Sequence, residues 1–165
     1  MSSANVPKPD FQTRRSAFLA LAIFLSVVIG VGFVIGFWVR PDAWYESLSK
    51  PSFNPPNALF APVWTVLYGM IALSGWLIWR VAQKSKAMCL WGSQMLLNWL
   101  WTPTFFWAHQ LMGALALMVA LFIVIALYIF QAQKLNKIAA SLFIPYILWI
   151  GFAMILNASL AWMNG

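Results

Sequence analysis

Aromatic and amide side chains recur together at helical spacing in three apolar stretches of this sequence. The sets are Gln94, Asn98 and Trp101; Trp149, Ala153 and Asn157; and Trp64 with Tyr68. Members of each set share one helix face because they lie three or four residues apart. Aromatic surfaces with a few amides favour a pocket for a flat, largely apolar ligand, whose orientation the polar groups fix. Alternatively, the amides only join helices through interhelical hydrogen bonds.

The tryptophans support the pocket because not all of them fit an interfacial role. The chain has 11 tryptophans, and several lie near the ends of apolar stretches, where indoles commonly sit at lipid headgroup level. Trp99, Trp101 and Trp149 instead fall well inside such stretches. A buried indole N–H needs a partner or a pocket. These three side chains are therefore expected at depth, close to a ligand.

Residues for acid–base or metal chemistry are scarce. The interiors of the predicted spans contain no Asp, Glu, Lys or Arg, which proton-coupled pumps and voltage sensors need within the membrane. The single histidine, His109, could be an axial haem ligand or only a polar residue in a turn. The single Cys89 cannot form a disulfide within the chain. No metal site and no required cofactor are predicted, and ordinary acid–base catalysis is not expected.

Composition identifies the elements that must position these side chains. Hydrophobic residues make up 63% of the chain and charged residues 8%, against about a quarter charged in soluble domains. The sequence therefore predicts an all-α integral membrane protein, a bundle of five transmembrane helices. Lengths of uncharged sequence place the helices at about 16–38, 61–80, 87–108, 111–133 and 138–162. Residues 1–15 form a tail, and residues 16–165 form a single membrane domain.

The segment between the first two helices is rich in proline and aromatic residues. Lys50-Pro51 and Asn54-Pro55-Pro56 cannot be helical, because proline fixes φ and pushes the preceding residue into an extended conformation. Loop 39–60 is therefore expected to form a stiff lid above the space that the helices enclose.

Basic residues predict the orientation of the chain. The N-terminal tail and the loops near 80–86 and 134–137 carry most of the Lys and Arg residues that make the net charge +7. Basic loops stay on the cytoplasmic side. The N-terminus is thus expected in the cytoplasm, with loop 39–60, His109 and the C-terminus outside. The charge is explained by topology, so nucleic-acid binding is not indicated.

Gly32 and Gly36 form a G-x-x-x-G motif in the first helix. Such a motif lets two helices approach closely. It predicts either a homodimer face or close packing within the chain.

Four motifs in the predicted order resemble the TspO/MBR family, which comprises bacterial tryptophan-rich sensory proteins and mitochondrial translocator proteins (peripheral benzodiazepine receptors). They are W-Y-x-x-L-x-K-P-x-x-x-P-P at 44–56, F-x-x-V-W-x-x-L-Y at 60–68, Q-x-x-L-N-x-x-W-x-x-x-F-F at 94–106, and P-Y-x-x-W-x-x-F-A-x-x-L-N at 145–157. The resemblance runs from about residue 16 to 164. It implies a five-helix bundle, usually dimeric, in a bacterial inner membrane, with a pocket closed by the loop.

The resemblance also implies a ligand and its binding residues. Relatives bind protoporphyrin IX, haem and synthetic isoquinoline carboxamides, and mitochondrial relatives also bind cholesterol. Carried onto matching positions, the pocket would comprise Trp44, Tyr45, Pro56, Phe60, Trp64, Tyr68, Asn98, Trp101, Phe105, Trp149, Ala153 and Asn157. The porphyrin or haem would be a ligand, and Arg40 or Lys50 at the outer rim could meet its propionates.

Three functions follow from the resemblance. The first is a membrane receptor, sensor or carrier for porphyrins that serves tetrapyrrole handling and stress response. The second is light-dependent porphyrin breakdown, for which the pair matching Trp64 and Trp149 is implicated in some bacterial relatives. The third is a sterol- or lipid-binding scaffold, which the end of the chain at Gly165, without a polar cholesterol-binding tail, disfavours. Ser52 and Phe53 stand where some bacterial relatives have two tryptophans, which predicts weaker loop contacts.

Overall fold

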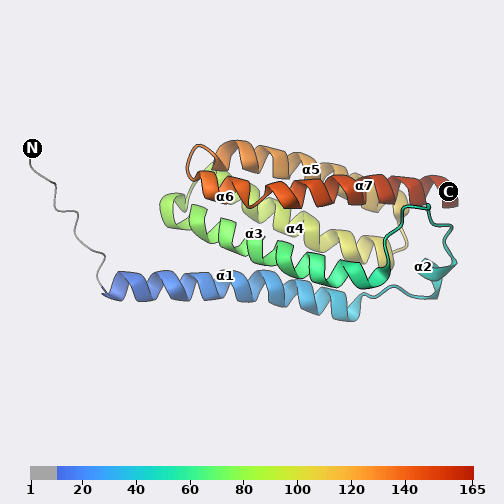
Figure 1. Cartoon of the computed structure of the whole chain (residues 1–165), viewed down its shortest axis with the longest axis horizontal. Coiled ribbons are helices and arrows are strands. Elements are labelled where there is room, and N and C mark those ends of the chain that lie inside the picture. The colour runs from blue at the N-terminus through green and yellow to red at the C-terminus, as the bar shows by residue number, and fades with distance from the viewer. Residues whose placement is uncertain (1–10) are drawn as a thin grey trace, which may run out of the picture.

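The computed structural model describes residues 11–165, with side chains from Ser16 onward, and every regular element in this part is helical. Most of the predicted tail lies outside the described residues. The elements are α1 (Phe11–Trp38), α2 (Ala43–Ser47), a 3₁₀ helix η1 (Asn57–Leu59), α3 (Phe60–Ala82), α4 (Lys86–Phe106), α5 (Leu111–Ala132), α6 (Lys137–Ser141) and α7 (Ile144–Asn164). The long helices lie side by side as a bundle, with α2 and the C-terminus at the same end (Figure 1). We call this the lid end.

The all-helical membrane fold is confirmed, while the predicted count of five helices is not exact. The long helices α1, α3, α4, α5 and α7 correspond to the five predicted spans, but α2, η1 and α6 are additional short helices. Within the described residues, four stretches meet the length and hydropathy expected of a membrane span, and α4 is not among them. The polar side chains of Gln94, Ser93 and Asn98 lower the hydropathy of α4 relative to its neighbours.

The first and last predicted helices differ from the structure. Helix α1 begins at Phe11, before the predicted start near residue 16, because no helix-breaking residue separates Phe11 from the apolar run. The predicted helix at 138–162 is divided into α6 and α7 near Leu142 and Phe143. Pro145 lies in the first turn of α7, where its missing N–H costs no helical hydrogen bond.

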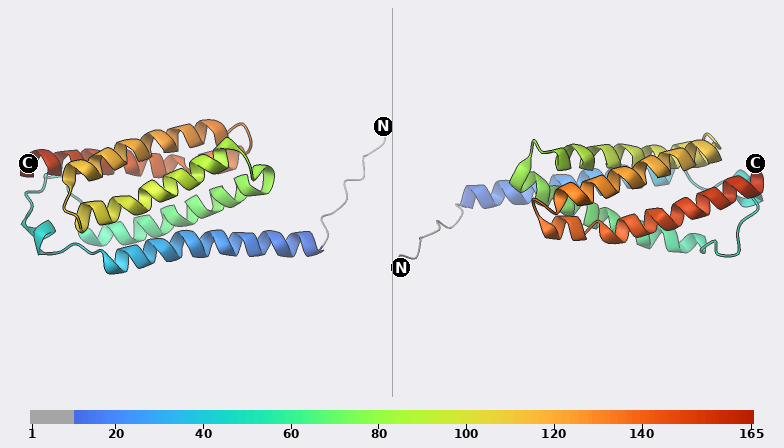
Figure 2. Two further views of the ribbon diagram at one scale, coloured as in Figure 1. Left: turned by 180° about the vertical axis from the view of Figure 1, so that it is seen from behind. Right: turned by 90° about the horizontal axis from the view of Figure 1, so that it is seen from above.

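Helix α5 packs along both α4 and α7, whereas α1 packs mainly against α3 and touches α4 less. Figures 1 and 2 show α1 running along the outside of the bundle. Of its described side chains only Val28 is fully buried, and Phe18, Ile23 and Phe33 are largely exposed. Exposed apolar side chains are expected where a helix faces lipid.

The end of the bundle opposite the lid is closely packed and holds a satisfied polar network. Ser74 Oγ donates to the Ala139 carbonyl at 2.7 Å, which leaves it to accept from the Tyr128 hydroxyl at 2.6 Å. Ser74, Tyr128 and Ala139 are all 0% exposed. This network joins α3, α5 and α6, and each of its three polar groups has a partner.

A close approach of α3 and α4 completes this end. A Cβ added at Gly75 would overlap the Trp91 ring, so only glycine leaves room for that indole. Trp91 Nε1 donates to the Ile71 carbonyl at 3.0 Å. The indole is thus both packed and hydrogen-bonded.

Candidate functional site: a tryptophan-lined cavity at the lid end

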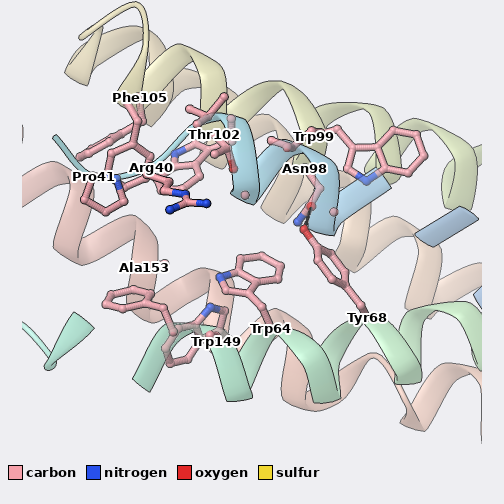
Figure 3. A pocket seen from close by; sticks show the side chains of 18 of the residues that line it. Arg40, Pro41, Trp64, Tyr68, Asn98, Trp99, Thr102, Phe105, Trp149 and Ala153 are labelled. Carbon is pink, nitrogen blue, oxygen red and sulfur yellow. Dashed lines mark hydrogen bonds between the residues drawn. The ribbon is translucent and has the colours of Figure 1, made fainter. Parts of the chain in front are cut away.

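A cavity of about 610 Å³ lies at the lid end, between α1, α3, α4, α5 and α7. This volume falls in the range of about 300–1,000 Å³ that is usual for small-molecule sites. Ten of the residues expected to bind a ligand line it, namely Tyr45, Phe60, Trp64, Tyr68, Asn98, Trp101, Phe105, Trp149, Ala153 and Asn157. Figure 3 shows α3 and α7 presenting Trp64 and Trp149 opposite the α4 side chains. Residues from distant motifs therefore surround one space.

Trp44, Pro56 and Lys50 do not line this cavity. Lys50 turns back onto the lid, where Nζ donates to the Glu46 carbonyl at 3.1 Å and lies 4.7 Å from the centre of the Tyr45 ring. Of the two cations predicted at the rim, only Arg40 lines the cavity. The sequence could not separate them, because both flank the lid loop.

The buried amides that line the cavity hydrogen-bond to the protein itself. Asn98 Oδ1 accepts from the Tyr68 hydroxyl at 3.0 Å, and Asn98 Nδ2 donates to the Tyr146 hydroxyl at 2.9 Å. Asn98 therefore joins α4 to α3 and α7. Tyr146, whose side chain is 0% exposed, was not among the residues predicted for the site. Tyr146 belongs to the fourth motif of the resemblance, but only the structure shows that its hydroxyl reaches Asn98.

Asn157 acts in the same way. Asn157 Oδ1 accepts from Trp101 Nε1 at 3.2 Å, and Asn157 Nδ2 donates to the Leu111 carbonyl at 3.0 Å. These contacts join α7 to α4 and α5. Both lining amides thus hold helices together, as the alternative interpretation of the sequence expected. Gln94 is fully buried away from the cavity, and its amide has no hydrogen-bond partner among the described residues.

Several hydrogen-bond donors of the lining have no partner among the described residues. Nε1 of Trp99 and Nε1 of Trp149 are buried without a hydrogen bond to any described residue. Arg40 donates from Nε to the Phe37 carbonyl at 2.9 Å, and its guanidinium points into the cavity (Figure 3). Trp99 was expected at depth from its place in the apolar run. Thr102, which also lines the cavity, gave no signal in the sequence.

The lid loop, residues 39–59, is fastened at two places. Asp42 caps α2 by accepting from the Tyr45 N–H at 3.1 Å, and His109 Nε2 lies 3.4 Å from Asp42 Oδ2. The capping hydrogen bond, helped by His109, lowers the pKa of Asp42 below its ordinary value of 3.8. His109 also stacks on Trp44, with ring centres 4.0 Å apart.

The second fastening is at the end of α7. Ser49 N–H donates to Asn164 Oδ1 at 2.8 Å, and Asn164 Nδ2 donates to the Ser49 carbonyl at 3.0 Å. Between the two fastenings, Tyr45 is 4% exposed and packs on Phe105 and Phe106. The proline-rich loop is therefore held against the bundle, as a lid would be.

His109 takes part in this fastening and does not line the cavity. Its φ is 55°, a left-handed conformation that side-chain-bearing residues seldom adopt. The turn between α4 and α5 places its ring on the lid. The geometry thus gives no support to His109 as a haem ligand. No group of three or more His, Cys, Asp or Glu residues suited to a metal ion occurs in residues 11–165.

The two glycines of the G-x-x-x-G motif differ in their surroundings. A Cβ at Gly32 would overlap the Tyr68 ring, whereas a Cβ at Gly36 would meet nothing within 4 Å. Both residues line the cavity. Gly32 therefore allows close packing within the chain, and its role in a dimer remains a prediction.

The sequence of this chain matches a known protein family. The model of the TspO/MBR family matches residues 22–163. The chain belongs to the TspO/MBR family. It is 33% identical to the tryptophan-rich protein TspO of Chlorobaculum tepidum over 152 residues, covering 88% of this chain and 96% of the relative.

Two further relatives come from a bacterium and from human. The tryptophan-rich sensory protein of Cereibacter sphaeroides is 31% identical over 138 residues, covering 82% of this chain and 87% of its own. The human translocator protein is 33% identical over 142 residues, covering 83% of this chain and 82% of its own. Bacterial and human members of the TspO/MBR family are thus about equally similar to this chain.

Proposed function

We propose that this chain is a membrane receptor or carrier that binds porphyrins, such as protoporphyrin IX, in the cavity at the lid end. The observation that carries the proposal is the convergence of Trp64, Trp149 and Phe60 on one cavity beneath a fastened loop. Trp149 meets Phe60 edge to face, with ring centres 5.8 Å apart. Indole and phenyl faces of this kind suit a flat, aromatic macrocycle.

Family membership supports the proposal in general terms. Relatives are named sensory and translocator proteins, and family resemblance implies tetrapyrrole ligands. We further propose that the chain sits in a bacterial inner membrane with its N-terminus in the cytoplasm, and that it forms a homodimer. Neither His109 nor Cys89 lines the cavity, so we expect the protein to recognise the macrocycle rather than a metal ion at its centre.

Filling the cavity tests the proposal. Ala153 lines the cavity on α7, so Ala153→Phe would place a ring where the ligand is expected. Ala126→Phe is the matched control, because Ala126 is exposed on α5 and does not line the cavity. Purified protein in detergent would be titrated with protoporphyrin IX, following the quenching of tryptophan fluorescence.

The native protein and Ala126→Phe should show saturable quenching at micromolar ligand. Ala153→Phe should show only the linear quenching that partition into micelles produces. Linear quenching in the native protein, or equal saturable binding in both variants, would contradict the proposal.

A second candidate function is light-dependent porphyrin breakdown. It is favoured because Trp64 and Trp149 line the same cavity, so both indoles could give an electron to one photo-excited ligand. Illumination of bound protoporphyrin IX should bleach its Soret band. The Trp64→Phe/Trp149→Phe double variant, loaded to equal occupancy, should bleach more slowly. Equal bleaching rates would show that these tryptophans are not the agents.

A further inference from the structure

The end of the bundle opposite the lid collects basic side chains. Arg80, Lys84 and Lys86 lie around the turn between α3 and α4, and Lys134 and Lys137 lie around the turn between α5 and α6. All five are exposed. The two turns lie at the same end of the molecule (Figures 1 and 2), and α6 packs against both α3 and α5. We call these five residues the basic end.

The basic end has no carboxylate to balance its charge in the described part of the chain. The acidic side chains of residues 11–165 are Asp42 and Glu46, and both belong to the lid. Asp42 faces His109, and Glu46 faces Lys50. No ion pair involves a residue of the basic end among residues 16–165. Its positive charges are therefore left for an anionic partner.

Two of these cations are held on aromatic rings. Lys134 Nζ lies 4.0 Å from the centre of the Phe130 ring, and Arg80 Cζ lies 4.8 Å from the centre of the Trp76 ring. Trp76 is itself fixed, because its Nε1 donates to the Ala17 carbonyl at 2.9 Å. Such contacts restrict a long side chain while its N–H groups stay free to donate. Less side-chain entropy is then lost when an anion binds.

Exposed apolar side chains are interleaved with the cations. Val81, Leu135 and Ile138 are 57%, 44% and 65% exposed, and each directly follows a basic residue in the sequence. Cations beside apolar groups match a phospholipid, whose charged phosphate adjoins its acyl chains. A soluble anion would leave these apolar side chains in water. The surface therefore suits a lipid better than a free phosphate.

We propose that the basic end binds the phosphodiester headgroups of anionic phospholipids, such as phosphatidylglycerol, with the acyl chains against the neighbouring apolar side chains. The proposal does not depend on porphyrin binding, because none of the five basic residues lines the cavity. Basic residues that serve only to orient the chain need not retain a particular lipid afterwards. Each Lys or Arg close to an anionic headgroup, in contrast, favours it about fivefold.

Spin-labelled lipids test the proposal. The full-length protein would be reconstituted into phosphatidylcholine vesicles that contain a trace of spin-labelled phosphatidylglycerol or phosphatidylcholine. Electron paramagnetic resonance then gives the fraction of each label held at the protein surface. Both leaflets have the same composition, so the orientation of the protein does not affect the result.

The native protein should hold phosphatidylglycerol about threefold more strongly than phosphatidylcholine at low ionic strength, because part of the lipid shell lies away from the basic end. Potassium chloride at about 0.5 M should bring this ratio close to one through screening. Potassium phosphate at equal ionic strength should have the same effect as the chloride.

Variants of the α5–α6 turn separate this surface from net charge. Lys134→Gln/Lys137→Gln should lower the ratio to less than about twofold, and Lys134→Arg/Lys137→Arg should keep it, because arginine also binds phosphate. Lys50→Gln is the control at the lid end, where Lys50 bonds to the lid itself, and it should leave the ratio unchanged.

The α3–α4 turn makes the second contribution, so Arg80→Gln/Lys84→Gln/Lys86→Gln should also lower the ratio. A ratio of one in the native protein would overturn the proposal and show that these charges only orient the chain. A ratio unchanged in both multiple variants, or reduced as much by Lys50→Gln, would also overturn it.

Two further results would assign the surface to another partner and so overturn the proposal. If phosphate abolished the lipid preference more strongly than chloride, the occupant would be a soluble phosphate. Saturable binding of polyglutamate to the protein in phosphatidylcholine vesicles, without any lipid preference, would identify an acidic protein instead.

Discussion

The two ends of the bundle use the same residue types in opposite ways. Away from the lid, Trp91 donates to the Ile71 carbonyl, and Ser74 and Tyr128 satisfy each other. At the lid end, Trp149 lines a cavity and its N–H has no partner in residues 16–165. A buried, unpaired donor is costly, so proteins seldom keep one without a use. Tryptophan content alone therefore does not mark a binding site. A buried indole N–H that has no protein partner does mark one.

Asn98 has features of both ends, because it lines the cavity and its hydrogen bonds also join three helices. Asn98→Leu should give the largest change in stability, because it leaves the Tyr146 hydroxyl buried and unpaired and removes the partner of Tyr68. We expect a loss of about 2–3 kcal/mol in the free energy of unfolding. Reversible unfolding in mixed detergent would measure it.

Gln94→Met is the matched control in the same helix. Gln94 is equally buried, but its amide has no partner among the described residues, so replacing it with an apolar side chain should cost nothing or stabilise the protein. Equal losses in Asn98→Leu and Gln94→Met would break the account, since burial rather than pairing would then decide stability.

Ser74→Ala should have a smaller effect, confined to the end opposite the lid. It removes the acceptor for Tyr128 and the donor to the Ala139 carbonyl, at a cost of about 1–2 kcal/mol. Porphyrin affinity should not change, because Ser74 does not line the cavity. Ser93→Ala is the control, since exposed Ser93 bonds only to a carbonyl of its own helix. A loss of porphyrin binding in Ser74→Ala would show that the two ends are coupled.

The smallest expected effect concerns pH and the lid. The folded-state pKa of Asp42 is lowered, so its contribution to the cap of α2 is fully present above pH 3.8 and is lost as pH falls through that lowered pKa. Because the backbone hydrogen bond is the main cause, His109→Ala should raise the pKa of Asp42 only part of the way to its ordinary value. A carboxyl-carbon NMR titration would measure both. A pKa at or above 3.8 in the native protein would show that the cap does not form.

Much of this fold could be predicted from the lengths of the apolar runs, because a helix that crosses lipid needs about 20 apolar residues. The division between α6 and α7 and the turn at His109 depend on tertiary packing, and the sequence places them only approximately. Helical spacing predicted that Asn98, Trp101, Trp149 and Asn157 face one space, and all four line the cavity. Helical spacing could not show that Asn98 and Asn157 are already hydrogen-bonded to Tyr68, Tyr146 and Trp101. Those hydrogen bonds join separate helices, and no local pattern predicts them.

Lid contacts were the hardest to predict. Trp44 was expected in the pocket, yet its ring is stacked on His109, a residue from the turn between α4 and α5. Similarly, Lys50 bonds within the lid, while Arg40 lines the cavity. The direction of a side chain on a proline-rich loop depends on what the loop packs against, which no local pattern records.

Trp91→Phe and Trp149→Phe test the central claim most directly, because the same atoms are removed at the two ends of the molecule. Each variant would be measured for both the free energy of unfolding and the affinity for protoporphyrin IX. Trp91→Phe should lose about 1 kcal/mol of stability and keep its affinity, since its N–H is bonded to the protein. Trp149→Phe should keep its stability and bind porphyrin severalfold more weakly. The account would be contradicted if the two variants gave the reverse result, or if both lost stability and affinity equally. Either outcome would mean that one end of the bundle does not stabilise the helix packing while the other binds the ligand.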